Sequence, residues 1–293
     1  MKIGICLPYM KPGINRKTIL DWCRAIDQGP YYSLSCGERI SGYTYEMRVI
    51  LSAAAAVTER VRIVPSLYVL PMTNAVRAAK EIATLDVLSE GRVTVCVGVG
   101  GREDDYRAVS ANFNNRFRRM DEQIATMKKI WSGEPAFEGG DEIGPRPCQD
   151  GGPPILVGAM GPKSINRFSK WADGIYGFAM NGEKELSQYF FEAAEKAWAD
   201  SGRTEAPYKM GGFWYSMADN AEQQLKNYVF DYLKIMGEEE ARKTANTMTR
   251  FTPESILDAL DATEEAGAEE IFLVPATADI AEVDRISALI AKR

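Results

Sequence analysis

Residues 61–101 read VRIVPSLYVLPMTNAVRAAKEIATLDVLSEGRVTVCVGVGG and decide the fold class. Two apolar runs, Val61–Leu67 and Val93–Val99, flank an amphipathic segment over Asn74–Leu88. Runs this short, apolar throughout and rich in Val and Ile, are typical of strands buried on both faces of a parallel sheet. The segment between them predicts a helix, with Thr73 as its cap and Gly91 just beyond its end. The stretch therefore predicts a strand–helix–strand unit with parallel strands.

The same alternation continues along the whole chain. The apolar runs that predict strands are Lys2–Leu7, Tyr32–Cys36, Val61–Leu67, Val93–Val99, Pro154–Gly158, Gly174–Phe178, Met210–Met217 and Glu270–Val274. The predicted helices are Thr18–Asp27, Tyr45–Arg60, Asn74–Leu88, Phe117–Trp131, Pro162–Trp171, Glu183–Ser201, Ala221–Met236, one that starts at Thr252-Pro253-Glu254, and one from Ile280 to the end. Eight strand–helix units in 293 residues predict an α/β fold, a (β/α)8 TIM barrel, as one domain over residues 1–293. Ser132–Gly152 and Gly237–Phe251 are expected to be loop insertions, the second partly helical.

Composition excludes several classes of partner. The formal net charge is −6, which argues against nucleic acid or an anionic membrane surface as a partner. No apolar run approaches the roughly 18 residues of a membrane span, and the first residues do not resemble a signal peptide. The five cysteines are scattered without a C-x-x-C pair, which indicates reduced thiols. We therefore expect a cytoplasmic protein.

The chain contains no histidine, and this absence limits its chemistry. It excludes Ser-His-Asp and Cys-His catalysis as well as His-ligated metals. The acids at predicted strand ends are too few and too scattered to specify a metal site, so no metal is expected. Chemistry must therefore come from carboxylates, Tyr, Ser, Lys and Arg, or from a bound cofactor.

The glycine-rich stretch VCVGVGGREDD, Val95–Asp105, raises the question of dinucleotide binding. The dinucleotide motif G-x-G-x-x-G needs glycine where this chain has Glu103, and it follows a first strand rather than a fourth. The acidic residues that follow would also repel a pyrophosphate. The better explanation is that Gly98 and Gly100 let the backbone pass close to a flat ring.

The stretch ILVGAMGPKS, Ile155–Ser164, predicts an anion site. A strand ends at Gly158, and a helix opens at Pro162 with Lys163 and Ser164 in its first turn. Free backbone N–H groups, the positive end of a helix, a lysine and a hydroxyl would converge there. The alternative is an ordinary helix that begins with proline.

Three further side chains at predicted strand ends are candidate catalytic residues, because a TIM barrel carries its active site at the carboxyl ends of its strands. They are Tyr9 after the first strand, and Glu38 and Arg39 after the second. Glu38 and Arg39 could form a simple ion pair or could contact a cofactor or substrate. The run Val64–Pro71, which continues past Ser66 between two prolines, could hold an unusual backbone conformation.

Taken together, these residues resemble the luciferase-like monooxygenase superfamily of flavin- and coenzyme F420-dependent enzymes. The resemblance covers nearly the whole chain and is carried by residues 53–108, 153–176 and 251–275. It implies a (β/α)8 barrel with a flavin or deazaflavin ring at the strand ends, and a non-prolyl cis peptide at Ser66-Leu67. The other residues that it implies as cofactor-binding are Gly98, Val99 and Gly100 beside the ring, and Gly158, Ala159, Met160 and Gly161 at the phosphate.

The resemblance implies an oxidoreductase that transfers hydride between F420 and a small organic substrate. One alternative is an FMNH2-dependent monooxygenase that uses O2 and a separate flavin reductase; another is a non-catalytic flavin-binding barrel. Glu38 stands where deazaflavin members commonly carry an acid, but Arg39 replaces the histidine that follows that acid in dehydrogenases of the group. Proton transfer then falls to Glu38, Tyr9, Glu103 or water. Phe251 replaces a usual glycine, and a homodimer is expected from the resemblance.

Overall fold

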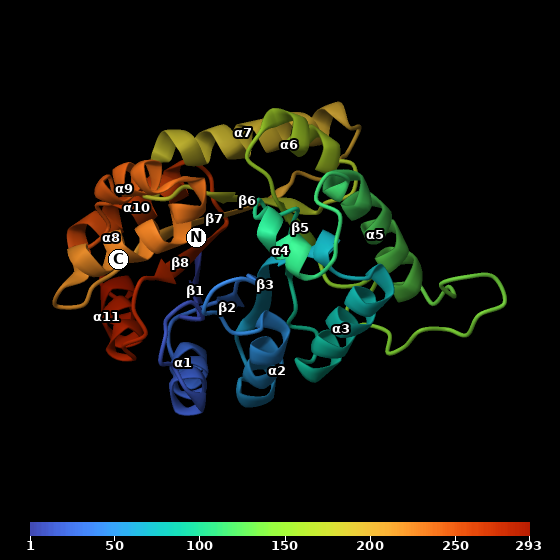
Figure 1. Ribbon diagram of the computed structural model, residues 1–293, viewed down its shortest axis with the longest axis horizontal. Coiled ribbons are helices and arrows are strands. Elements are labelled where there is room, and N and C mark those ends of the chain that lie inside the picture. The colour runs from blue at the N-terminus through green and yellow to red at the C-terminus, as the bar shows by residue number, and fades with distance from the viewer.

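Eight parallel strands pair in chain order and close into a barrel in the computed structural model, which describes residues 1–293 (Figure 1). The strands are β1 Lys2–Cys6, β2 Ser33–Cys36, β3 Arg62–Val69, β4 Val95–Gly98, β5 Ile155–Gly158, β6 Gly174–Phe178, β7 Tyr208–Tyr215 and β8 Glu270–Pro275. The barrel closes between β1 and β8, where Lys2 pairs with Glu270 and Ile5 with Leu273. The predicted (β/α)8 barrel is confirmed, with one strand in each predicted run.

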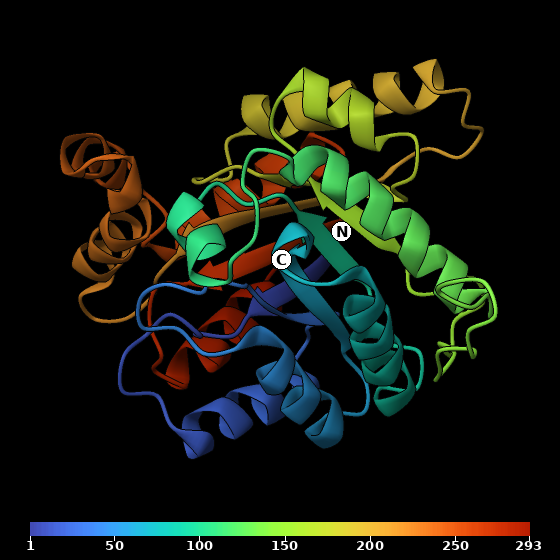
Figure 2. The ribbon, with the colours of Figure 1, turned by 45° about the vertical axis from the view of Figure 1, so that its right-hand side comes forward.

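Helices surround the barrel on its outside (Figure 2). They are α1 Arg16–Gln28, α2 Met47–Val57, α3 Ala75–Leu88, α4 Glu103–Ala108, α5 Arg116–Trp131, α6 Pro162–Phe168, α7 Lys184–Asp200, α8 Ala221–Leu233, α9 Glu238–Asn246, α10 Pro253–Glu265 and α11 Ala281–Ile290, with the short 3-10 helices η1 Leu70–Met72 and η2 Lys234–Met236. None of them combines the length and the apolar character needed to cross a membrane. The insertion Gly237–Phe251 contains α9, as its composition predicted, whereas most of Ser132–Gly152 is a loop.

The cap of α3 differs from the sequence prediction. Asn74, not Thr73, is the N-cap residue, because its side chain accepts hydrogen bonds from the amides of Val76 and Arg77 at 2.9 and 3.2 Å. The carbonyl of Thr73 instead accepts a hydrogen bond from the Gln123 side chain at 2.8 Å, which ties α5 to the start of α3. Asparagine and threonine both cap helices well, so composition alone did not separate these neighbours.

The acidic run after β4 forms a helix that the sequence pattern did not predict. Glu103, Asp104 and Asp105 occupy the first turn of α4, where the helix dipole favours negative charge. Glu103 and Asp104 are exposed, and Asp104 forms an ion pair with Arg107 at 3.4 Å. Asp105 is buried. The charge run therefore starts a short helix that turns one carboxylate inward.

The interior of the barrel is filled by side chains from alternating strand positions. They form a buried cluster of Val64, Cys96, Leu156, Tyr176, Met210 and Phe272, and Leu67 and Phe178 pack on it. At the amino-terminal end, the buried carboxylate of Glu270 accepts hydrogen bonds from Ser33 and from Tyr208. The interior of the barrel is therefore a packed core.

Candidate active site

The carboxyl ends of all eight strands meet at one end of the barrel, which we call the mouth. Most of the molecule's strand residues are buried, but several residues at the mouth are partly exposed. They include Arg39, Ser66, Leu67, Val69, Val99, Gly100, Arg102, Gly158, Gly161 and Phe178. The structure thus brings residues of the predicted ring and phosphate groups to the same end of the barrel.

The peptide bond between Ser66 and Leu67 is cis, as the resemblance implies. The pairing of β3 with β4 skips one residue here, because Ser66 pairs with Cys96 and Tyr68 with Val97. Leu67 is left unpaired in this bulge, and its side chain packs on the interior cluster of the barrel. The bulge therefore places an apolar side chain at the centre of the mouth.

The glycines at the ends of β4 and β5 make room for protein side chains. A β-carbon on Gly98 would lie 2.9 Å from Cδ1 of Leu67, and one on Gly158 would lie 2.6 Å from the same atom. Gly100 has a φ of +62°, and a β-carbon there would lie 2.7 Å from Cγ1 of Val69. The sequence argument attributed Gly98 and Gly100 to a flat ring. Contacts with β3 already account for them.

The loop between β5 and α6 carries backbone donors that the protein does not use. The N–H groups of Ala159, Met160, Gly161 and Lys163 donate no hydrogen bond to any protein atom. A β-carbon on Gly161 would have only the Ser164 hydroxyl, 3.9 Å away, as a neighbour. The Lys163 side chain is exposed. The loop therefore offers unsatisfied donors and a positive charge in open space, which suits an anion.

The Glu38 side chain points toward α2 and forms no ion pair with its neighbour Arg39. Its carboxylate accepts a hydrogen bond from the Val69 amide at 2.7 Å and forms an ion pair with Arg48 at 3.4 Å. Its side chain is only 5% exposed, and burial raises its pKa to about 7 although Arg48 opposes the shift. Glu38 thus holds the backbone just beyond the Leu67 bulge. Arg48, its partner, was not singled out from the sequence.

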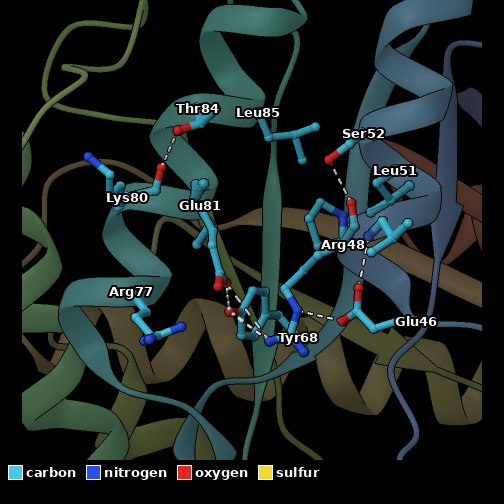
Figure 3. Close-up of a pocket in the computed structure, with 13 residues that line it drawn as sticks. Glu46, Arg48, Leu51, Ser52, Tyr68, Arg77, Lys80, Glu81, Thr84 and Leu85 are labelled. Atoms are coloured by element: carbon cyan, nitrogen blue, oxygen red, sulfur yellow. Dashed lines mark hydrogen bonds and ion pairs between the residues drawn. The ribbon is translucent and has the colours of Figure 1, made fainter.

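A cavity of about 690 Å³ lies on the outside of the barrel, between α2 and α3 (Figure 3). Arg48, Tyr68 and Glu81 meet on its floor, where the Tyr68 hydroxyl donates to Glu81 at 2.8 Å. Arg48 reaches the Tyr68 hydroxyl at 3.3 Å and links this floor to Glu38. The cavity is separated from the mouth by the barrel wall. We place the candidate active site at the mouth, where the unused backbone donors lie.

Arg39 and Arg102 carry the positive charge of the mouth. The Nε atom of Arg39 is buried and has no hydrogen-bond partner. Arg102 donates to the carbonyl of Tyr232 at 2.5 Å, and its guanidinium lies 5.5 Å from the centre of that ring. Burial and the charge of Arg39 both lower the pKa of Arg102. Tyr232 lies on α8, 130 residues away in the chain, so no local pattern indicated it.

Tyr9 is buried beneath the end of β2. A β-carbon on Gly37 would lie 2.3 Å from its hydroxyl oxygen, so the phenol fits only because residue 37 is glycine. Burial raises the pKa of Tyr9, and the neighbouring Tyr228 and Tyr232 add to the shift. The phenol is therefore neutral near pH 7.

Asp105 holds the loop after β2 in place. Its two carboxylate oxygens accept hydrogen bonds from the amides of Ile40 and Ser41 at 3.2 and 2.9 Å. These amides directly follow Arg39, so Asp105 positions that arginine. Glu103, a candidate for proton transfer from the sequence, is exposed on α4 and makes no hydrogen bond with a protein atom.

The sequence profile of the luciferase-like monooxygenase family matches residues 1–290. The chain belongs to this family. An uncharacterised protein of Mycobacterium tuberculosis is 34% identical over 139 residues, which are 45% of this chain and 49% of that protein. The chain spans about half the length of the curated relatives it matches.

Solved structures of luciferase-like proteins share the fold over the whole chain. An F420-dependent secondary alcohol dehydrogenase has a TM-score of 0.83 at 18% identity, with 99% of this chain and 98% of that one covered. The monooxygenase RslO1 from Streptomyces bottropensis has a TM-score of 0.79 at 20% identity, with coverage of 100% and 98%. An F420-dependent dehydrogenase and a monooxygenase are therefore both among the structural neighbours of this chain.

Proposed function

We propose that this chain is an oxidoreductase that transfers hydride between the deazaflavin F420 and a small organic substrate at the barrel mouth. The observation that carries the proposal is the set of unused donors at residues 159–163, in a family of flavin- and F420-dependent oxidoreductases. A phosphate on the cofactor would accept hydrogen bonds from these donors. When bound, the deazaflavin ring supplies the hydride chemistry.

The residues of the mouth fit a flat, largely apolar ring. Leu67 and Val99 present apolar surface there, and Gly98 and Gly158 leave room for the Leu67 side chain. Glu38 fixes the far side of the Leu67 bulge through the Val69 amide. Glu38 is therefore proposed as a positioning residue for the ring support. Ser66, Gly100, Ala159, Met160 and Gly161 complete the proposed cofactor contacts.

Tyr9 is the group that we propose to hold the transferred proton. Its phenol is neutral and buried. A β-carbon on Gly37 would lie 2.3 Å from the Tyr9 hydroxyl oxygen and 3.2 Å from the carbonyl oxygen of Ser66, so these two oxygens lie close together. Arg39 occupies the position of the family's histidine, and a guanidinium donates hydrogen bonds but accepts none. Arg39 is therefore proposed to bind and orient the substrate rather than to act as a base.

The proposal is tested by titrating the purified protein with F420 and with FMN, and by following the absorbance of the ring and the thermal unfolding midpoint. We expect F420 to bind with a dissociation constant below about 100 µM. Tight binding of FMN alone would favour the alternative, an FMNH2-dependent monooxygenase with a separate reductase. Binding without turnover of any substrate would indicate a non-catalytic barrel, and no binding of either compound would contradict all of these functions.

A further inference from the structure

Two arginines near the mouth have no ion-pair partner. Arg39 follows β2 and Arg102 follows β4, and neither forms an ion pair. The adjacent acid, Asp105, uses both of its oxygens for the amides of Ile40 and Ser41. Glu38 pairs with Arg48 on the other side of the strand ends. The two guanidinium groups thus have no ion-pair partner, although the charge of Asp105 raises the pKa of Arg102 and so opposes part of the effect of Arg39.

The two arginines are held in different ways. Arg102 is fixed by its hydrogen bond to the Tyr232 carbonyl and by its position over the Tyr232 ring. The Nε edge of Arg39 is buried and makes no hydrogen bond. The hydrogen bonds from Ile40 and Ser41 to Asp105 hold the loop of Arg39 against the start of α4, which Arg102 directly precedes. Burial raises the pKa of Tyr232, and the charges of Arg102 and Arg39 oppose that shift while Asp105 adds to it.

Aromatic side chains border the arginines on the side of α8. The Tyr232 ring lies 5.1 Å from Trp214, and Trp214 lies 4.9 Å from Phe178, both measured between ring centres. Phe178 and Tyr232 are partly exposed. This combination of cationic and aromatic side chains would suit an organic molecule that has a charged group at one end.

We infer that the substrate is an organic acid whose carboxylate binds Arg39 and Arg102 and whose apolar body lies against Phe178 and Tyr232. The Nε edge of a guanidinium presents two parallel N–H groups that match the two oxygens of a carboxylate. An anion would also relieve the repulsion between two partly buried cations. The inference rests on the proposed function, because it names the substrate class of that same site.

Isothermal titration calorimetry tests the inference by measuring the binding of small organic acids to the whole chain, with and without F420. The probes are phenylacetate, benzoate and hexanoate, and the neutral control is phenylacetamide. We expect at least one acid to bind below about 10 mM, and phenylacetamide to bind about tenfold more weakly than phenylacetate or not at all. Equal binding of phenylacetate and phenylacetamide, or no binding of any acid, would overturn the inference.

Variants of the two arginines test whether the acid binds at the proposed site. Arg39→Met and Arg102→Met are each expected to weaken binding of the acid about tenfold or more. Arg107→Met is the matched control, because Arg107 is an exposed arginine on α4 that pairs with Asp104. Unchanged acid binding by both of the first two variants overturns the inference. So does a loss of F420 affinity with no loss of acid affinity, because the arginines would then hold the cofactor.

The two proposals fail in different ways. If the proposed function is wrong, F420 does not bind to the wild-type protein or binds without turnover of any substrate, whatever the acids do. If the substrate class is wrong, the cofactor binds and the acid has no advantage over its amide. The comparison of acid with amide uses wild-type protein and does not depend on the folding of any variant.

Discussion

The side chain of Leu67 fills the space that a β-carbon on Gly158 would need: such an atom would lie 2.6 Å from Cδ1 and 2.7 Å from Cδ2 of Leu67. The two residues come from β3 and β5, so the contact crosses β4 at the mouth. The same leucine excludes a β-carbon from Gly98 on β4. One side chain therefore explains why two neighbouring strands end in glycine.

This contact predicts that Gly158→Ala and Leu67→Ala are not additive. Gly158→Ala forces Leu67 to move and is expected to lower the free energy of unfolding by about 1–3 kcal/mol. In the double variant the added methyl group enters the space left by Leu67, so the combined loss should be smaller than the sum by about 0.5 kcal/mol or more. Urea unfolding of the four proteins measures this difference. Strict additivity would mean that the two side chains do not compete for the same space.

At the loop between β5 and α6, Gly161→Asp should weaken cofactor binding without loss of stability. Aspartate is a favourable N-cap residue, so the unfolding midpoint should stay at or above that of the wild type. Its charge would repel a bound phosphate by about 1–4 kcal/mol, which corresponds to at least about a fivefold loss of affinity. The measurement is titration with F420 and with FMN.

Two controls separate charge from shape at this loop. Gly161→Ala adds a β-carbon where the nearest atom is the Ser164 hydroxyl at 3.9 Å, so we expect nearly normal affinity. Asn227→Asp adds the same charge on α8 and can still accept the hydrogen bond from Gln223. If Gly161→Asp binds the cofactor as well as Gly161→Ala does, the phosphate lies elsewhere.

The buried carboxyl of Glu38 should make stability depend on pH. Its pKa is raised from 4.5 to about 7 in the folded protein, so the folded state holds the proton more tightly than the unfolded chain. The contribution of Glu38 to the free energy of unfolding is on the order of 3 kcal/mol. It is fully present below pH 4.5 and is lost as the pH rises to about 7. Glu38→Gln should remove this part of the pH dependence. Urea unfolding between pH 4.5 and 8 compares the two proteins, and parallel curves would contradict the prediction.

Loss of the Asp105 carboxylate should loosen the loop that carries Arg39. Asp105→Ala leaves the amides of Ile40 and Ser41 without their acceptors, and each hydrogen bond to a charged group contributes about 1.5–3 kcal/mol. Amide hydrogen exchange at residues 40 and 41 should therefore become faster. Asp104→Ala is the control, because that side chain is exposed on the same helix. Equal exchange in all three proteins would show that Asp105 does not anchor the loop.

Much of the site was accessible from the sequence because its signals are local. The end of β4 in glycine, the turn Gly158–Gly161 and the bulge at Ser66-Leu67 each lie within one short stretch, and the family resemblance located them. The contacts of Glu38 and Arg39 were not accessible in this way. The two residues are neighbours in the sequence but have different partners. Glu38 forms an ion pair with Arg48. The charge of Arg39 instead acts to lower the pKa of Arg102 and of Tyr232.

The sequence by itself determined the barrel. The length, order and apolar character of the strand runs are properties of consecutive residues, and burial of those runs requires helices on the outside of a parallel sheet. Only the tertiary structure decided which charges remain unpaired at the mouth. Asp105 reaches back to the loop after β2, and Tyr232 comes from α8 to meet Arg102. These contacts join residues that are distant in the chain, and they form only when the closed barrel brings the strand ends together.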